Sequence, residues 1–284
     1  MIQKLLKRFN TRTHVLCVLS LFALHSSAAA EGQLNASVTA EQSVVHAFSC
    51  LLVRATLENK TGDALQLTQP VTEMHGTVRV LLRRPGSEDF GEVKGRYFGL
   101  KDSLNYRSVL QAGETIAAHV LLLCDRDEKF VFDKVGEYQL RVAIEVPPNC
   151  VTSATVNIDV KDATGDLLRV VREFKKDMSR ISLYEALPRE QLLRLKSALA
   201  PFAQYELPLL WVEAVSMEAE RVSRLQQLRT TQSRAWKELA TVSLAKYLAE
   251  RGQRKESKQL LSEVTARSKL SDDTRRILDE MNNN

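Results

Sequence analysis

The spacing of the apolar residues changes once along the chain. In the first part apolar residues alternate with polar ones, as at Val53 and Ala55, which is the period of a half-buried strand. In the second part they recur every three or four residues from Leu167 onward, which is the period of an amphipathic helix. The sequence therefore predicts a multidomain chain, with an all-β domain over residues 31–161 and an all-α helical domain over residues 162–284.

The all-β region contains about seven short apolar stretches separated by turn residues. The turns carry glycine, proline and asparagine, as in Asn59–Gly62 and Arg84–Ser87. About seven strands in a region of roughly 130 residues are typical of a β-sandwich. None of the connections shows a helical apolar stripe, so we expect no helices among these strands.

One stretch of this region runs from Leu110–Glu114 through Phe132–Tyr138 to the last expected strand. It resembles the second half of an immunoglobulin-like domain of bacterial secreted proteins. Gly136-Glu137-Tyr138 is similar to the tyrosine corner of such domains, which implies that the Tyr138 hydroxyl ties its strand to the preceding turn. Leu140 stands where antibody domains carry their second cysteine, so the resemblance is to the sandwich architecture.

Three cysteines lie beyond residue 30, namely Cys50, Cys124 and Cys150. The immunoglobulin-like arrangement implies that Cys50 and Cys124 lie at one end of the sandwich, near enough for a disulfide, and leaves Cys150 unpaired. The alternation that includes Val53 argues against this pairing, because it places Cys50 on the opposite face unless a bulge intervenes. Both interpretations stay open.

The all-α region has the apolar spacing of roughly six helices. One long helix is expected from just after Pro208 to Leu228. The segment Trp236–Val264 carries large and small residues at fixed positions: Leu244, Ala245, Leu248, Gly252, Leu261 and Val264. This pattern resembles a tetratricopeptide-type helical hairpin with Gly252 in its turn. A generic helical hairpin explains the same residues.

The first thirty residues have the pattern of an export signal. They contain four basic side chains and no acidic one: Lys4, Lys7, Arg8 and Arg12. An apolar run, Val15–Leu24, and the small residues Ala28–Ala30 follow, as in a secretory signal peptide. We therefore expect residues 1–30 to be a signal peptide, the mature chain to be periplasmic or extracellular, and no transmembrane segment to remain in it.

The charge of the chain argues against a nucleic-acid partner. The formal net charge is +5 from 40 basic residues, and setting aside the four in the signal segment leaves 36 basic against 35 acidic residues. A nearly neutral body lacks the positive field that phosphate backbones require. Four basic residues still cluster around the Gly252 turn: Arg251, Arg254, Lys255 and Lys258. They form either a surface for an acidic protein partner or a solvated helix start.

The sequence contains no motif for catalysis, cofactor binding or metal binding. His-Glu-x-x-His, Gly-x-Ser-x-Gly and phosphate-binding glycine loops do not occur, and no two cysteines have metal-ligand spacing. His46, His75 and His119 lie on or beside expected strands, and we interpret His119 as a residue on the sheet surface. We therefore expect no catalytic residue, no cofactor and no metal ion.

After these exclusions, we expect a secreted or periplasmic non-enzymatic protein that acts as a protein-interaction or scaffold protein. One alternative is a carbohydrate- or cell-envelope-binding module, for which Tyr97, Phe98 and Tyr106 would supply exposed aromatic rings. Another is a hydrolase, or a protease inhibitor that presents the turn Arg83–Gly86. A hydrolase site assembled from distant residues is not visible in sequence spacing.

Overall fold

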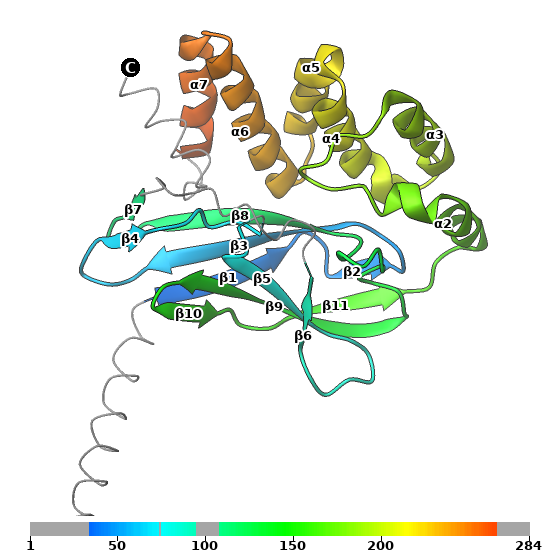
Figure 1. The fold of residues 1–284 in the computed structure, drawn as a ribbon, viewed down its shortest axis with the longest axis horizontal. Helices are drawn as coiled ribbons and strands as arrows, with labels where there is room; N and C mark the ends of the chain where they lie inside the picture. Colours follow the sequence, from blue (N-terminus) through cyan, green and yellow to red (C-terminus); the bar gives the residue numbers. More distant parts are fainter. Residues whose placement is uncertain (1–33, 74, 95–107, 266–284) are drawn as a thin grey trace, which may run out of the picture.

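Figure 1 shows the fold of the chain as a computed structural model, which describes residues 34–73, 75–94 and 108–265. The expected signal segment 1–30 and the aromatic residues Tyr97, Phe98 and Tyr106 lie outside these ranges. The strands are β1 (Leu34–Ala40), β2 (Val44–His46), β3 (Leu51–Asn59), β4 (Leu65–Leu67), β5 (Val78–Arg83), β6 (Gly91–Val93), β7 (Ser108–Leu110), β8 (Thr115–Leu122), β9 (Gly136–Val146), β10 (Asn149–Thr152) and β11 (Val156–Lys161). The helices are α2 (Gly165–Met178), α3 (Arg189–Leu199), the 3-10 helix η1 (Ala203–Tyr205), α4 (Glu206–Ser216), α5 (Glu218–Arg229), α6 (Arg234–Glu250) and α7 (Arg254–Thr265).

The strands form three sheets. One sheet has the order β1-β3-β8, the second has the order β2-β11-β9-β5-β6 with β10 paired to β9, and the third is the pair β4-β7. All pairings are antiparallel except that of β11 with β2. In Figure 1 the β1-β3-β8 sheet lies between the other large sheet and the helices. The described chain therefore stacks in three layers.

The expected fold class, a multidomain chain with an all-β immunoglobulin-like sandwich followed by an all-α bundle with a tetratricopeptide-like hairpin, is wrong. The structure is a mixed α/β fold, in which neither half forms a separate sandwich or bundle. One buried apolar cluster joins Val53 of β3 to Leu192 of α3, and a second joins Leu52 of β3 to Trp211 of α4. The two halves therefore share their apolar cores.

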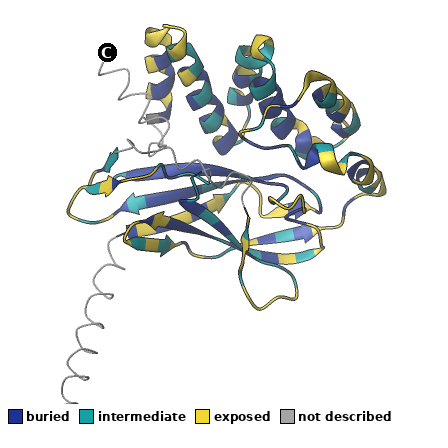
Figure 2. Cartoon of the chain, in the orientation of Figure 1, coloured by how far each residue is buried: buried dark blue, intermediate teal, exposed yellow. Residues whose placement is uncertain are grey.

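The two halves share their apolar cores because β3 and β8 are buried on both faces. Six consecutive residues at the start of β8 are buried, and Figure 2 shows the same burial along most of β3. A strand covered on both faces has a nearly continuous apolar sequence. The segment Ile116–Leu123 is apolar except for His119. This nearly continuous apolar run is therefore the sequence feature that indicates a second buried face, which the helices cover.

The long helix expected from Pro208 to Leu228 is also wrong, because the chain breaks at Met217. Met217 has extended backbone angles, φ −125° and ψ 99°, and separates α4 from α5. The Arg221 guanidinium turns back and donates to the carbonyls of Ala214, at 3.0 Å, and Val215, at 3.3 Å. These bonds satisfy carbonyl groups that the end of α4 leaves without helical partners.

Helices α6 and α7 pack against each other across a short turn. Gly252 in that turn has φ +78°, a conformation that favours glycine and ends α6. Ser257 is fully buried between the helices and its hydroxyl donates to the Ala245 carbonyl at 2.7 Å. The small residues at these two positions allow the close approach.

Tyr138 of β9 is buried, with its ring 5.3 Å from that of Phe132. Its hydroxyl accepts a hydrogen bond from the backbone N–H of Lys134 at 3.1 Å. The strand is thus tied to the preceding turn, as we expected for this tyrosine. Among the described residues, none of the helices has the length and apolar character to span a bilayer.

Candidate functional site

Two clefts lie between the β1-β3-β8 sheet and the helices. The larger, which we call cleft 1, has a volume of about 680 Å³ and is bounded by the end of β1, the start of β3, the start of α4 and the start of α6. The smaller, cleft 2, has a volume of about 230 Å³ and lies over β8, between the connection from α2 to α3 and helices α4 and α6. Together they make the outer face of this sheet the candidate functional site.

Cleft 1 combines an apolar wall with a polar rim. Leu52, Leu207 and Trp236 line the wall, and the Arg54 side chain also lines the cleft. Trp236 is buried, so its indole is held in place by packing. Glutamine side chains, which can both donate and accept hydrogen bonds, contribute to the lining, among them Gln232.

A contact from the sheet side holds the start of α6 beside cleft 1. Ser233 caps the helix, and its hydroxyl accepts a hydrogen bond from the backbone N–H of Trp236 at 3.1 Å. Glu41, which follows β1, accepts the Ala235 N–H at 3.0 Å and also bonds the Ser233 hydroxyl. A carboxylate at a helix N-terminus is favoured by the positive end of the helix dipole. Glu41 therefore fixes the position of Trp236 relative to the sheet.

Three polar residues lie between the sheet and α6, of which His119 and Glu238 are buried and Arg54 is partly buried. The Arg54 Nε lies 3.3 Å from Glu238 Oε2, and the two side chains are 15% and 5% exposed. His119 on β8 is the register partner of Arg54 on β3. Arg54 lines cleft 1 and His119 lines cleft 2, so this group separates the two clefts.

Burial shifts the pKa values of His119 and Glu238. Burial, and to a smaller extent the nearby Arg54 charge, together lower the pKa of His119 from 6.5 to about 3. The imidazole is therefore neutral at pH 7. Burial also raises the pKa of Glu238, and this effect exceeds the opposite effect of Arg54.

Cleft 2 is lined by aromatic and aliphatic side chains. Trp211 of α4 forms part of the lining, and its indole N–H donates to the Leu183 carbonyl at 3.1 Å, which fixes the ring. Leu239 and Val242 of α6 also line the cleft. His119 lines the cleft from the sheet, and its Nε2 atom is buried with no hydrogen-bond partner.

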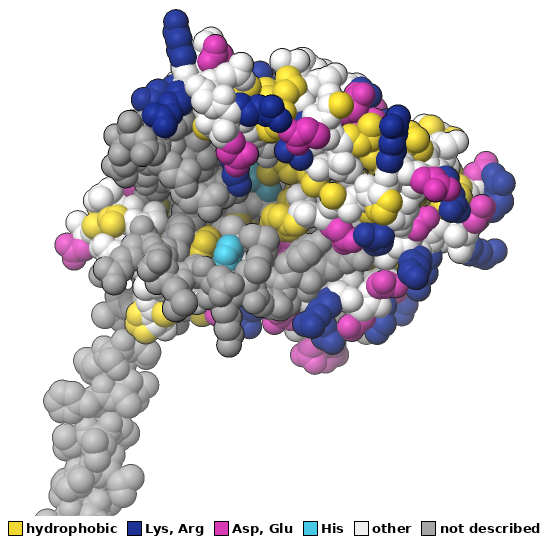
Figure 3. Space-filling model, turned by 45° about the horizontal axis from the view of Figure 1, so that its top comes forward, with side chains coloured by type: hydrophobic (Ala, Val, Ile, Leu, Met, Phe, Trp, Pro, Cys, Tyr) yellow, Lys and Arg dark blue, Asp and Glu magenta, His cyan; other side chains and the backbone are white. Residues whose placement is uncertain are grey.

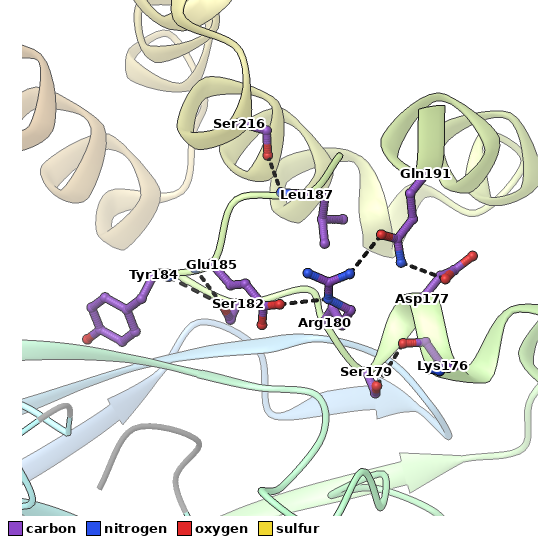
Figure 4. Close-up of polar contacts among 10 residues, drawn as sticks. All are labelled: Lys176, Asp177, Ser179, Arg180, Ser182, Tyr184, Glu185, Leu187, Gln191 and Ser216. Carbon is purple, nitrogen blue, oxygen red and sulfur yellow. Dashed lines mark hydrogen bonds and ion pairs between the residues drawn. The ribbon is translucent and has the colours of Figure 1, made fainter. Parts of the chain in front are cut away.

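A polar network positions the chain segment that brings Leu183 and Tyr184 to cleft 2. Arg180 donates to Glu185 at 2.6 Å and to the Gln191 side-chain oxygen at 2.9 Å, and the Gln191 amide donates to Asp177 at 2.6 Å. Figure 4 shows Tyr184 pointing away from this network, over the sheet. The connection between α2 and α3 is thus fixed at the edge of the cleft.

The structure places Cys50 and Cys124 at the same end of β3 and β8, and holds both as thiols. Burial raises the pKa of the Cys50 thiol, and the nearby Cys124 raises it further. The disulfide between Cys50 and Cys124 remains a prediction. Cys150 is exposed on β10, where Arg79 Nη2 lies 3.7 Å from its sulfur.

The four basic residues around Gly252 have different surroundings. Arg251 binds Glu218 of α5 and lies 4.5 Å from the centre of the Tyr247 ring. Arg254, Lys255 and Lys258 are exposed on α7. Figure 3 shows acidic and basic side chains interspersed over the helices on the face in view. A partner surface formed by all four residues remains a prediction.

The expected inhibitor turn is held against the strand layer. Arg84 Nη1 donates to the Val131 carbonyl at 2.9 Å and to Asp133 at 2.7 Å. His46 and His75 bond elsewhere, to the Asp162 carbonyl and the Thr72 hydroxyl, each at 2.8 Å. In the described ranges no group of three or more His, Cys, Asp or Glu side chains could hold a metal ion.

Sequence reasoning missed Arg54, Glu238 and both clefts, and it misplaced His119. The interpretation of His119 as a sheet-surface residue is wrong, because helices cover that surface and the side chain is 8% exposed. The available signal was a histidine inside a continuous apolar run. Glu238 gave no signal of this kind, since its burial depends on how α6 lies on the sheet.

Comparisons with known proteins give no family for this chain. No family model matches it, and no curated protein matches its sequence. It is similar over 50% of its length to 56% of Spo0M, a sporulation control protein from Bacillus subtilis, with 10% identity and a TM-score of 0.29. It is similar over 45% of its length to 30% of the alkylpurine DNA glycosylase AlkC from Pseudomonas fluorescens, with 13% identity and a TM-score of 0.29. The matched stretches span less than two thirds of either protein, and similarity at this level assigns neither fold nor function.

Proposed function

We propose that this chain is an exported, non-enzymatic protein-interaction protein, and that cleft 1 receives a segment of its protein partner. The observation that carries this proposal is the composition of the cleft. A fixed tryptophan, Trp236, and a partly buried arginine, Arg54, line a depression with polar groups around it. Tryptophan and arginine are enriched among the residues that contribute most to protein–protein binding.

The size and rigidity of cleft 1 support this function. Its volume of about 680 Å³ exceeds what one small side chain would fill and lies in the usual range of binding pockets. The bonds from Glu41 and Ser233 order the wall before any partner binds. Binding to an ordered wall loses less conformational entropy than binding to a mobile one.

The location outside the cytoplasm is part of the same proposal. It rests on the basic, apolar and small-residue segments within residues 1–30. A scaffold protein requires no cofactor, and the sequence contains no cofactor-binding motif.

Blocking cleft 1 tests the proposal. The purified chain is used to select binders from a phage library of random peptides, and the affinities of the selected peptides are measured by fluorescence anisotropy. Ala203 is exposed and lines the cleft, so Ala203→Trp should reduce the affinity of these peptides at least about tenfold.

Ala219, exposed on α5 and outside the cleft lining, provides the matched control. Ala219→Trp should leave the affinities unchanged. Failure to select any peptide, or equal binding to both variants, would contradict the assignment of cleft 1.

A further inference from the structure

Cleft 2 contains a buried polar atom that nothing in the described part of the protein satisfies. This atom is Nε2 of His119, which lines the cleft from β8. A buried group without a hydrogen-bond partner carries an unfavourable free energy that a suitable ligand would remove. Its position in a cleft of about 230 Å³ marks it as the specific contact of a small binding site.

The neutral state of His119 restricts which ligand atom can meet Nε2. A neutral imidazole carries one N–H and one bare nitrogen, and which of them is Nε2 depends on the tautomer. A hydroxyl group satisfies both cases, because it can donate a hydrogen bond or accept one. A cationic group is disfavoured there, since Arg54 lies next to His119 in the sheet.

The walls of cleft 2 favour a flat apolar body. Trp211 and Tyr184 contribute aromatic rings, and Leu239 and Val242 contribute aliphatic side chains. The Trp211 ring is held by its bond to Leu183, so it offers a preformed surface for another ring. Aromatic pairs gain free energy beyond their buried area when they stack offset or edge to face.

Cleft 2 also offers a positive charge. Lys246 of α6 lines the cleft and is exposed, and no ion pair to its ammonium group occurs within the described residues. A carboxylate placed there would interact with the ammonium group while remaining partly hydrated. His119 and Lys246 therefore select different groups on one ligand.

We propose that cleft 2 binds a small phenolic carboxylic acid, with its hydroxyl on His119, its ring against Trp211 and its carboxylate at Lys246. This site is separate from cleft 1 and does not depend on the proposed protein partner.

Calorimetry on the full chain with three probes tests the proposal without any variant. The first probe is 4-hydroxyphenylacetate, which has all three groups. Phenylacetate lacks the hydroxyl, and tyramine has an ammonium group in place of the carboxylate. We expect phenylacetate and tyramine each to bind at least about tenfold more weakly, because each leaves one polar group of the cleft unmatched. Equal affinities for the three probes, or no binding of 4-hydroxyphenylacetate at millimolar concentration, would overturn the proposal.

Two variants on α6 locate the site. Lys246→Gln should weaken the binding of 4-hydroxyphenylacetate severalfold but should not weaken that of tyramine, because it removes a positive charge that repels the tyramine ammonium group. Lys237→Gln, an exposed lysine on the same helix outside the cleft lining, should change neither. His119→Leu should remove the preference for the hydroxylated probe. A preference that persists in His119→Leu, or an equal effect of the two lysine variants, would place the ligand elsewhere.

Discussion

The two faces of the β1-β3-β8 sheet are both buried, yet they are built from different residues. The inner face packs against the second large sheet mainly through apolar side chains along β3, among them Val53, Ala55 and Leu57. The outer face, under the helices, carries Arg54 and His119 among its apolar residues. Both clefts lie on the outer face.

The difference shows how one strand serves two purposes. The inner face carries no charged side chain along β3, so its contribution to the free energy of folding comes mainly from apolar burial. The outer face buries charged groups, which stabilise a fold less than apolar packing does. Both proposed binding sites lie on this less stabilising outer face.

We expect the largest difference between the two faces when a leucine on each face of β3 is replaced by alanine. Leu57 is fully buried on the inner face, and Leu57→Ala should lower the free energy of unfolding by about 4 kcal/mol, because it opens a cavity between two sheets. Leu52 lies on the outer face beside cleft 1, and Leu52→Ala should lower it by about 2 kcal/mol, because it only enlarges an existing depression. Urea denaturation measures both values.

The same residue type, substitution and strand make Leu52→Ala the matched control for Leu57→Ala. A loss at Leu52 as large as that at Leu57 would show that the two faces are packed equally well. The distinction between a stabilising and a binding face would then not hold.

The difference between the faces also explains what sequence could predict. The alternation through Val53, Ala55 and Leu57 correctly predicted a strand with an apolar inner face, since this pattern depends only on the strand period. The break at Met217 could not be predicted, because it depends on Arg221 reaching back to the end of α4. The ion pair of Arg54 with Glu238 joins residues far apart in the chain, and neighbouring residues give no sign of it.

A second test uses pH to separate the faces. The pKa of His119 is about 3 in the folded protein, through burial first and Arg54 second, against 6.5 without these effects. His119 binds a proton more readily in the unfolded chain than in the folded protein. The free energy of unfolding is therefore unaffected by His119 above about pH 6.5 and decreases as the pH falls toward 3. We expect a loss of about 2 kcal/mol between pH 8 and pH 5, measured by urea denaturation at each pH.

Variants on the outer face identify the source of the pH dependence. His119→Leu should flatten it, whereas His46→Gln, at an exposed histidine, should not. Glu238 acts in the opposite direction, because its raised pKa adds stability as the pH falls, so Glu238→Gln should steepen the loss. An unchanged slope in His119→Leu would mean that the outer face does not control the acid sensitivity.

The smallest test asks whether the sheet and the helices are coupled at cleft 1. Ser233→Ala removes the cap of α6 and should lower the free energy of unfolding by about 1 kcal/mol. Because Glu41 bonds the Ser233 hydroxyl, the double variant with Glu41→Ala should deviate from additivity by about 0.5 kcal/mol or more.

Thr164 caps α2 in the same way but has no bond to Glu41. The losses from Thr164→Ala and Glu41→Ala should therefore add, within about 0.5 kcal/mol. Coupling at Ser233 without coupling at Thr164 would mean that the loop after β1 holds the start of α6, and with it the tryptophan wall of cleft 1. Additivity at both caps would instead mean that packing alone sets the width of the cleft, and the ordered wall on which the proposed binding depends would lose its polar anchor.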